Sequence, residues 1–415
     1  MNRTARIGII VVSVAIFCYA GIGHVLGRSP DDRAYKSLTV YAEVLQKVQQ
    51  DYVDDPNMHM VTAGALHGLL ESLDPSSSYL TPREYTEYKE KTSNAATGET
   101  GLTLSKRYGY IIVVSVLPDS PAAKSGLHSG DILESVGGFT TREMSVGQAF
   151  NLLHGAPGSG VKAGVVRSGK ADPEQVDLVR DKLAPEKIVT QKAEADVLAL
   201  RLVTLDAGRA EQVKNLLLDA QKQGVHKVIL DVRDCGRGQV SEAIAVARLF
   251  VQSGTLTTLK GQTVSPQTFP ADASKVVWKG PASILVDGTT SGAAEVLASA
   301  FEATHRGDVV GERTFGLASE QKLIPIEDGS ALILTVANYY NADGKSIIEE
   351  GVTPTEVVSA NANDDTSDDD SNSNASADQQ QKQEKAEPRP LSADDPIFQK
   401  ALELLKAPAP AKKAA

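Results

Sequence analysis

The sequence predicts an α+β protein built from several domains. Its 415 residues are enough for two or three domains, each with its own hydrophobic core. Apolar residues recur at helical spacing over residues 28–95, and short strands punctuated by glycine follow over residues 96–185. Strands and helices then alternate over residues 186–358. The expected organisation is a helical N-terminal region, a small β-rich domain and a larger α/β core.

Composition limits the classes of function. The formal net charge of −11 argues against a nucleic-acid partner. The two cysteines, Cys18 and Cys235, do not indicate a metal site, and no cofactor is expected. Residues 359–394 are rich in Asp, Ser, Asn and Gln, which predicts a disordered acidic linker. Residues 395–415 are predicted to form a short helix, in which Asp395 caps the first turn, and a tail.

The first residues predict an exported protein. The segment MNRTAR is basic, and residues 7–27 are apolar apart from His24, a run long enough to cross a hydrocarbon core of about 30 Å. Since Arg3 and Arg6 precede this run, the positive-inside rule keeps the N-terminus in the cytoplasm. We predict an uncleaved signal anchor over residues 1–27, with the bulk of the chain on the periplasmic or another extracytoplasmic side. A cleaved signal peptide is the alternative.

The region after the anchor is helical and ends in a turn. Apolar spacing predicts amphipathic helices over residues 34–51 and 59–73. The chain then reads LDPSSSYLTP over residues 73–82, which predicts a turn followed by a short helix.

The small β-rich domain carries a recognisable motif. The stretch SPAAKSGLHSGDIL over residues 120–133 resembles the signature of PDZ domains. The resemblance implies that a loop offers backbone N–H groups to the carboxylate of a peptide end, which pairs beside the following strand under a helix. Peptide or protein C-termini are therefore the expected partners. By position, the peptide-binding residues are Gly101, Leu102, Thr103, Leu104, Gln148 and Leu152.

The α/β core is organised around residues 285–321. A buried strand over residues 282–286 ends in a turn, a helix follows over residues 292–303, and a short strand returns at residues 309–311. Such an arrangement holds a nucleophile at a helix N-terminus beside backbone donors. The composition of residues 290–292 is also typical of a simple helix cap, in which a hydroxyl satisfies open N–H groups.

This stretch resembles the carboxy-terminal processing, or tail-specific, serine protease family. The family reads roughly S-A-S-A-S-E, then a helix, then V-G-x-x-T-F-G-K-G-x-x-Q, and this chain shares Glu295, Val310-Gly311, Thr314-Phe315-Gly316 and Gln321. The turn LDPSSSYLTP resembles the family's sLDPHSsYlxPxE, with Ser76 where His is usual. The resemblance covers residues 34–358 and implies a crotonase/ClpP-like α/β protease core.

The resemblance places the catalytic positions on residues without catalytic side chains. The nucleophilic serine of the family falls on Gly292, its general-base lysine on Leu317, and an acidic residue of some members on Ala303. Glycine offers no nucleophile and leucine no proton acceptor. A shifted pair of Ser291 and Lys322 is the alternative, although Lys322 is expected to point to the opposite face from its neighbour Gln321.

A second turn also departs from the family pattern. After the strand over residues 227–234 the family reads N-P-G-G, where a backbone N–H helps to form the oxyanion hole. In this chain Gly236 replaces the proline and Arg237 the first glycine, followed by Gly238. We expect a flexible turn whose donors lie at Arg237 and Gly238, with a bulky side chain beside the cleft.

Two hypotheses of different classes follow. The first is a membrane-anchored, exported relative of these proteases that binds peptide ends through its PDZ domain and cleaves nothing, that is, a pseudoprotease or adaptor. The second is a serine-type endopeptidase that cleaves proteins near their C-termini with rearranged groups. We favour the first hypothesis, because two of the substitutions remove a reactive group, the nucleophile and the base, without putting another in its place. The sequence leaves open whether the chain pairs with itself or with an active relative.

Overall fold

The computed structural model describes residues 32–94, 96–167, 170, 172–359 and 390–406. The chain divides into two compact units, Met1–Ala65 and Leu66–Ala415. The predicted signal anchor lies outside the described residues, as does most of the predicted acidic linker. In the part of the chain that the structure describes, no helix is both long enough and apolar enough to cross a membrane.

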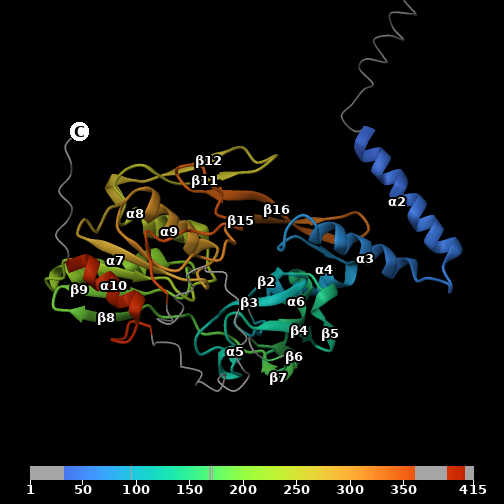
Figure 1. Ribbon diagram of the computed structural model, residues 1–415, viewed down its shortest axis with the longest axis horizontal. Coiled ribbons are helices and arrows are strands. Elements are labelled where there is room, and N and C mark those ends of the chain that lie inside the picture. The colour runs from blue at the N-terminus through green and yellow to red at the C-terminus, as the bar shows by residue number, and fades with distance from the viewer. Residues whose placement is uncertain (1–31, 95, 168–169, 171, 360–389, 407–415) are drawn as a thin grey trace, which may run out of the picture. The chain divides into compact units, whose positions relative to one another are not determined.

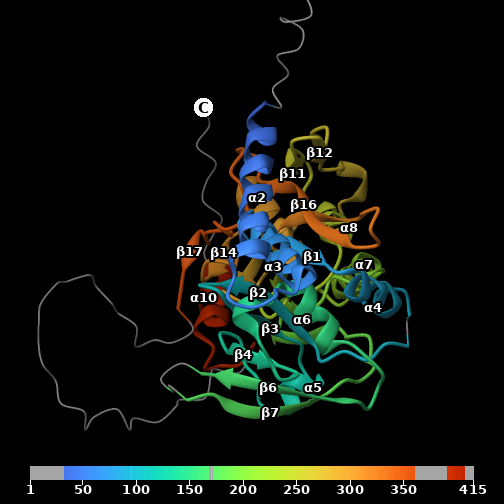
Figure 2. The ribbon, with the colours of Figure 1, turned by 90° about the vertical axis from the view of Figure 1, so that its right-hand side faces the viewer.

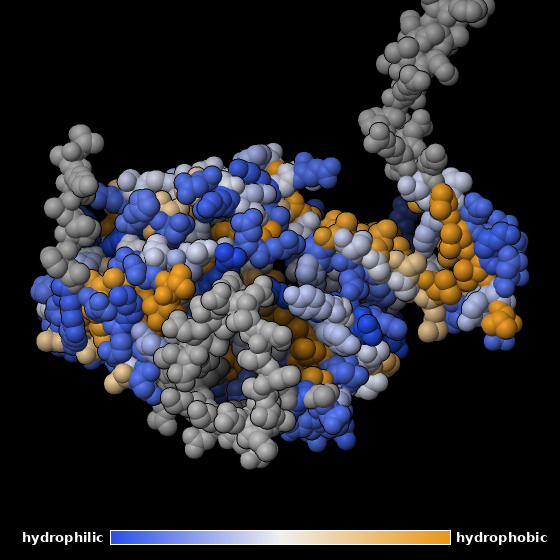
Figure 3. Space-filling view, in the orientation of Figure 1, coloured by the Kyte–Doolittle hydropathy of each residue, from blue (hydrophilic) through white to orange (hydrophobic). Residues whose placement is uncertain are grey.

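The first unit contains α2 (Asp32–Asp51) and the beginning of α3 (Met58–Glu71). Both helices lie close to their predicted ranges. Apolar side chains gather along α2 (Figure 3), and Leu38, Val40 and Val44 are between 54% and 59% exposed. These side chains therefore contribute little buried apolar surface to the described fold.

The motif LDPSSSYLTP forms a turn and then a strand, where we predicted a turn and a helix. Asp74 Oδ1 accepts hydrogen bonds from Ser76 N and Ser77 N, both at 2.8 Å, which fixes the turn. The strand β1 (Ser78–Leu80) then pairs with β16 (Ala331–Tyr340) before α4 (Pro82–Ser93) begins. A short strand rather than a helix forms because a partner 250 residues away supplies its hydrogen bonds.

The small β domain contains the predicted short strands and one long helix. Its strands follow the order β2-β3-β4-β6-β7 (Figure 2), and β5 also pairs with β4. α6 begins with a capping box, in which Ser145 Oγ accepts from Gln148 N and Gln148 Oε1 accepts from Ser145 N. The elements are β2 (Leu102–Arg107), β3 (Tyr110–Val116), α5 (Pro121–Lys124), β4 (Ile132–Val136), β5 (Phe139–Thr140), the 3-10 helix η1 (Thr141–Glu143), α6 (Val146–Leu153), β6 (Gly160–Val166) and β7 (Glu174–Val179).

The core sheet has the order β17-β14-β13-β10-β9-β8. Its strand pairs are parallel except for β8 with β9. Parallel sheets are covered on both faces, which agrees with the predicted α/β core. The strands are β8 (Val189–Glu194), β9 (Val197–Arg201), β10 (Lys227–Asp231), β13 (Ala282–Val286), β14 (Val309–Gly311) and β17 (Glu356–Val357).

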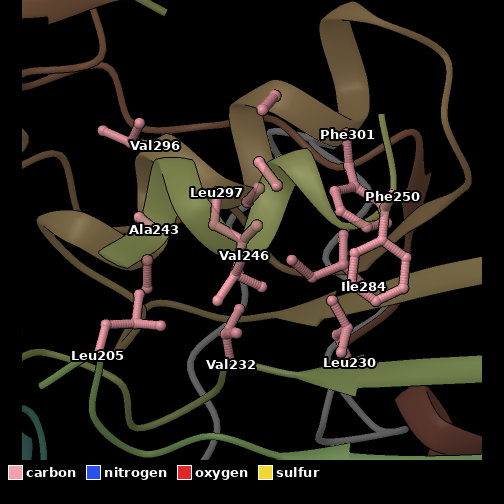
Figure 4. Packing of buried hydrophobic residues seen from close by; sticks show 14 of the residues in the cluster. Leu205, Leu230, Val232, Ala243, Val246, Phe250, Ile284, Val296, Leu297 and Phe301 are labelled. Carbon is pink, nitrogen blue, oxygen red and sulfur yellow. The ribbon is translucent and has the colours of Figure 1, made fainter. Parts of the chain in front are cut away.

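Successive side chains of the core strands are buried on opposite faces of the sheet. On one face, Leu230 and Ile284 pack with Phe250 and Phe301 beneath the helices (Figure 4). The helices of this face are α7 (Arg209–Lys222), α8 (Val240–Arg248) and α9 (Ala293–Ala303). The bounds of α9 agree with the predicted helix over residues 292–303.

The opposite face of the core sheet is covered by α10 (Pro396–Lys406), drawn in red in Figure 1. Asp395 caps this helix as predicted, because its Oδ1 accepts from Phe398 N at 3.1 Å. The same carboxylate binds Arg233 through bonds of 3.0 and 2.7 Å. The start of α10 is thus attached to the segment that follows β10 and leads into the second turn.

A third sheet lies beside the core. It has the order β1-β16-β11-β12, and β15 also pairs with β16. The strand β15 was not predicted, because its residues alternate weakly in polarity. The remaining elements are β11 (Thr255–Lys260), β12 (Gln267–Pro270), the 3-10 helix η2 (Ala273–Lys275) and β15 (Ser319–Pro325).

Candidate functional site

The predicted nucleophile position lies in a turn that connects β13 to α9. We call residues 287–292 the helix-entry turn. Gly292 has φ 60° and ψ −117°, a conformation that only glycine adopts without strain. No atom lies within 4 Å of the position that a Cβ would occupy there. The backbone thus keeps a sharp strand-to-helix turn that would expose a side chain at residue 292.

The helix-entry turn is not capped by a hydroxyl, which corrects the predicted cap. Glu295 Oε2 reaches back and accepts from Gly292 N at 2.8 Å. Thr290 Oγ1 instead donates to Val232 O at 3.0 Å, and Ser291 Oγ has no hydrogen-bond partner among the described residues. The cap comes from Glu295 because its carboxylate, fully buried on the first turn of α9, can reach that N–H.

Glu295 also holds the second half of the predicted catalytic segment. Its Oε1 accepts from Thr314 Oγ1 and Gly316 N, both at 2.6 Å, and its Oε2 accepts from Leu317 N at 2.7 Å. Burial raises the pKa of Glu295, although these donors oppose the shift. This one carboxylate therefore fixes Gly292 beside Leu317.

A cavity of about 340 Å³ lies where these segments meet the PDZ domain. None of its lining residues is a Lys, Arg, His, Asp or Glu. We call it the central cavity. It is lined by Ser76, Tyr88, Leu104, Val146, Gly147, Phe150, Gly236, Ser291, Gly292, Leu317, Ser319, Gln321 and Ile333.

The central cavity brings together some of the predicted catalytic positions. Gly292, Leu317 and Gln321 line it, whereas Ala303 lies at the far end of α9 and does not. Ser291 lines it too and is 1% exposed. Lys322 is exposed, pairs with Leu334 in the β15–β16 ladder and does not line the cavity. The shifted pair of Ser291 and Lys322 is therefore not assembled.

The second turn, residues 234–238, is called the donor turn. It is bonded to the helix-entry turn, since Ser291 N donates to Cys235 O at 3.1 Å and Asp234 N to Thr289 Oγ1 at 2.6 Å. Burial raises the pKa of the Cys235 thiol to about 12. This cysteine is therefore a neutral thiol at neutral pH and no substitute nucleophile.

Arg237 does not lie beside the cleft, contrary to our expectation. Its guanidinium binds Glu99 of the PDZ domain with bonds of 2.8 and 3.1 Å. Although burial opposes the shift, His154 and Arg237 hold the pKa of Glu99 at about 2. Gly238 is closely packed, because a Cβ there would lie 2.5 Å from the Leu205 backbone. The donor turn is therefore clamped rather than flexible.

Gly236 marks the closest approach of the PDZ domain to the donor turn. A Cβ at this position would lie 2.2 Å from Ser115 Oγ and 2.8 Å from Thr103 Oγ1. Thr103 Oγ1 also donates to Gly236 O at 3.3 Å. Close packing of β2 and β3 therefore explains a glycine here where the family has a proline.

Of the predicted peptide-binding residues, Leu104 alone lines the central cavity. Gly101 is buried against Ser120, while Leu102 and Thr103 pair with β3. Gln148 Nε2 donates to Glu84 Oε1 at 2.7 Å, and Leu152 packs against the PDZ core.

The residues of α6 that line the cavity were not predicted. They are Val146, Gly147 and Phe150. The i, i+4 spacing of Val146 and Phe150 could have identified this face. Likewise, Ser319 could have been identified from Gln321, because residues two apart in a strand point to the same face.

A second cavity, of about 980 Å³, lies on the other side of the helix-entry turn. Asp234 and Asp287 both line it. Burial, and then the neighbouring Asp234, raise the pKa of Asp287 to about 6. In the described residues, no cluster of three or more His, Cys, Asp or Glu side chains is arranged to hold a metal ion.

The two domains that form this site each match the model of a known protein family. Residues 196–358 match peptidase family S41, and residues 112–167 match the PDZ domain. Both ranges fall inside the core and the PDZ domain predicted from the sequence.

Curated relatives extend the similarity over most of the chain. A carboxy-terminal-processing protease of Bartonella bacilliformis is 28% identical over 333 residues, which cover 79% of this chain and 76% of that protein. The carboxy-terminal processing protease CtpA of Bacillus subtilis is 26% identical over 362 residues, which cover 85% of this chain and 77% of that protein. Among solved structures, the photosystem II D1 C-terminal processing protease has a TM-score of 0.65 at 25% identity, covering 77% of this chain and 92% of that one.

Proposed function

Because the chain belongs to the family of carboxy-terminal processing proteases with a PDZ domain, we propose that it is a member that binds peptide ends without cleaving them. One observation carries this proposal. The cavity at the catalytic position is lined by Gly292 and Leu317, and no lining residue is a Lys, His, Asp or Glu. Acyl transfer by a serine needs a proton acceptor within hydrogen-bond reach. The cavity supplies none.

The capacity to bind peptides comes from the PDZ domain. Its strand β2 and helix α6 face the central cavity with Leu104, Val146 and Phe150. These apolar side chains suit a peptide with apolar residues near its end. We therefore propose protein C-termini as ligands and an adaptor role for the complex.

The test is a pair of activity measurements on the purified chain. Unstructured proteins with apolar C-termini should stay intact during long incubation, and a fluorophosphonate probe should label no serine. Either turnover or labelling that disappears in Ser291→Ala would replace this proposal with the alternative below.

The alternative is a working serine endopeptidase that acts near protein C-termini. The relatives favour it, since those named above are proteases. The retained turn geometry at Gly292 and the Glu295 hydrogen bonds also favour it. In this chain it would need Ser291 as nucleophile and a base brought by movement of β15 or by the substrate. The proposal without cleavage needs neither.

We further propose that the chain is anchored in a membrane by residues 7–27 with its domains exported. The support is the basic start, MNRTAR, followed by an apolar run. Fractionation of cells that produce the chain, with protease added from the outside, checks it. Recovery of the intact chain in the soluble cytoplasmic fraction would contradict the anchor.

A further inference from the structure

We propose that the central cavity itself receives the carboxylate of the bound peptide end, at the N-terminus of α9. This inference rests on the proposed function and deepens it, because it assigns the carboxylate to the vacated catalytic position. The ligand is a peptide that ends in a small apolar residue with a free α-carboxylate.

The first support is an unsatisfied hydroxyl at this helix end. Ser291 is 1% exposed, lines the cavity, and its Oγ has no hydrogen-bond partner among the described residues. A buried hydroxyl without a partner costs about 1 to 3 kcal/mol. A carboxylate in the cavity would accept that hydrogen bond and remove the cost.

The second support is the helix itself. α9 has 11 residues and begins directly after Ser291 and Gly292, both of which line the cavity. The N-terminus of a helix carries a partial positive charge that favours anions. The space is open, because no atom lies within 4 Å of the Cβ position of Gly292.

The charges around the cavity permit an anion. No lining residue is acidic. Glu295, in the first turn of α9, has both oxygens engaged by four donors and does not line the cavity. Asp287 of the helix-entry turn does not line it either. Leu104, Val146 and Phe150 provide an apolar wall for the side chains of the peptide. A volume of about 340 Å³ is at the small end of ligand pockets, which suits small terminal residues.

The loop that we expected to hold the carboxylate is less suited to it. Gly101 is buried, with Ser120 Cβ only 2.3 Å from the position of a Cβ. Thr103 is engaged by the donor turn through Gly236 O. Of that loop, Leu104 alone reaches the cavity. The hydroxyl of Ser291, which lines the cavity directly before α9 and has no partner among the described residues, is therefore the better-placed donor.

The experiment is a titration of the purified full-length chain with a labelled peptide that ends in Ala-Val, beside its C-terminal amide. We expect the free acid to bind at least about tenfold more tightly, since hydrogen bonds to charged groups are among the stronger ones. Ser291→Ala should remove most of that difference. Ser299→Ala is the matched control, because Ser299 is also 1% exposed and without a hydrogen-bond partner among the described residues, but lies within α9 and does not line the cavity.

A second pair of variants keeps the test independent of folding defects at Ser291. Leu317→Glu places a negative charge in the cavity and should abolish binding of the acid, whereas Leu317→Gln of similar size should retain it. Equal affinity of the acid in wild type, Ser291→Ala and Leu317→Glu would overturn the assignment and leave the proposed function standing. No binding of either peptide to the wild type would overturn both.

Discussion

The two turns that border the central cavity differ from the family pattern in different ways. The helix-entry turn has lost its reactive side chain but keeps the backbone that would present one, with φ 60° at Gly292 and an open space beside it. The donor turn has exchanged its side chains and is bound to the PDZ domain by Arg237 and around Gly236. The backbone of the helix-entry turn is thus kept although its side chain differs from that of the family, whereas the substitutions in the donor turn are coupled to the packing of the PDZ domain.

The largest effect is expected where the helix-entry turn is held together. Glu295→Ala should lower the free energy of unfolding by about 4 kcal/mol or more, because it leaves four donors unsatisfied and each costs about 1 to 3 kcal/mol. Denaturant unfolding measures it. Glu211→Ala, which removes an exposed ion pair with Lys214, is the control and should change stability by under about 0.5 kcal/mol. Equal effects would show that Glu295 is not the support of this turn.

Restoring a nucleophile and a base at the family's catalytic positions tests whether the donor turn can still serve as an oxyanion hole. Gly292→Ser with Leu317→Lys places a hydroxyl and an amine in the same cavity. We expect cleavage at least about a hundredfold slower than by an active relative, since loss of one oxyanion donor costs about a hundred- to a thousandfold in rate. Peptide hydrolysis measures it, with Gly292→Ser and Leu317→Met as the control that lacks a base. Full activity would mean that the donor turn, although clamped, still supplies the backbone donors of an oxyanion hole.

Strain at Gly292 can be measured by itself. Gly292→Ala should destabilise the fold by about 1 to 3 kcal/mol, because an L-residue is strained at φ 60° and ψ −117° even in open space. Gly288→Ala lies in the same turn, also in open space but without a positive φ, and should be neutral or slightly stabilising. Thermal unfolding of both variants gives the difference. Similar melting temperatures would argue against a strained turn.

The clamp between the donor turn and the PDZ domain should contribute a moderate amount. Arg237→Ala removes two bonds to Glu99 and should lower the free energy of unfolding by about 1 to 2 kcal/mol, since the pair is partly exposed. A double-mutant cycle with Glu99→Gln separates the pair from other losses. Lys222→Ala, in an exposed pair with Asp219, serves as the control. A coupling energy near zero would show that the pair of Arg237 and Glu99 does not hold the donor turn to the PDZ domain.

The last effect depends on pH and concerns the burial of Asp287 beside Asp234 of the donor turn. The folded-state pKa of Asp287, about 6, is above its ordinary 3.8, so its protonation stabilises the fold below 3.8 and this contribution is lost as the pH rises through 6. Asp287→Asn should therefore be more stable than the wild type at pH 8, by up to about 3 kcal/mol, since each unit of pKa corresponds to about 1.4 kcal/mol.

The advantage of Asp287→Asn should shrink as the pH falls below 4. Chemical denaturation at both pH values measures it, and Asp343→Asn, an exposed carboxylate, gives the baseline. If the difference in stability between Asp287→Asn and the wild type is the same at both pH values, it does not come from the titration of Asp287.

The sequence determined the local features of this protein. Cap residues and apolar spacing predicted α2, α3, α9 and the start of α10 to within a few residues, because helix limits depend on neighbours along the chain. The resemblance to the protease family, aligned on Glu295 and Thr314-Phe315-Gly316, also identified Gly292 and Leu317, and the structure brings both to one cavity. The direction of Lys322 followed from the period of a strand.

The tertiary structure decided which side chains surround the cavity. The direction of Arg237 depends on Glu99, 138 residues earlier, and β1 needs a partner strand 250 residues later. The bonds of Glu295 to Thr314, Gly316 and Leu317 likewise form only once distant segments are packed, and only then is the hydroxyl of Ser291 buried without a partner among the described residues. Periodicity along the chain carries no information about such contacts, because they arise from the docking of distant segments, where burial decides which donor finds an acceptor.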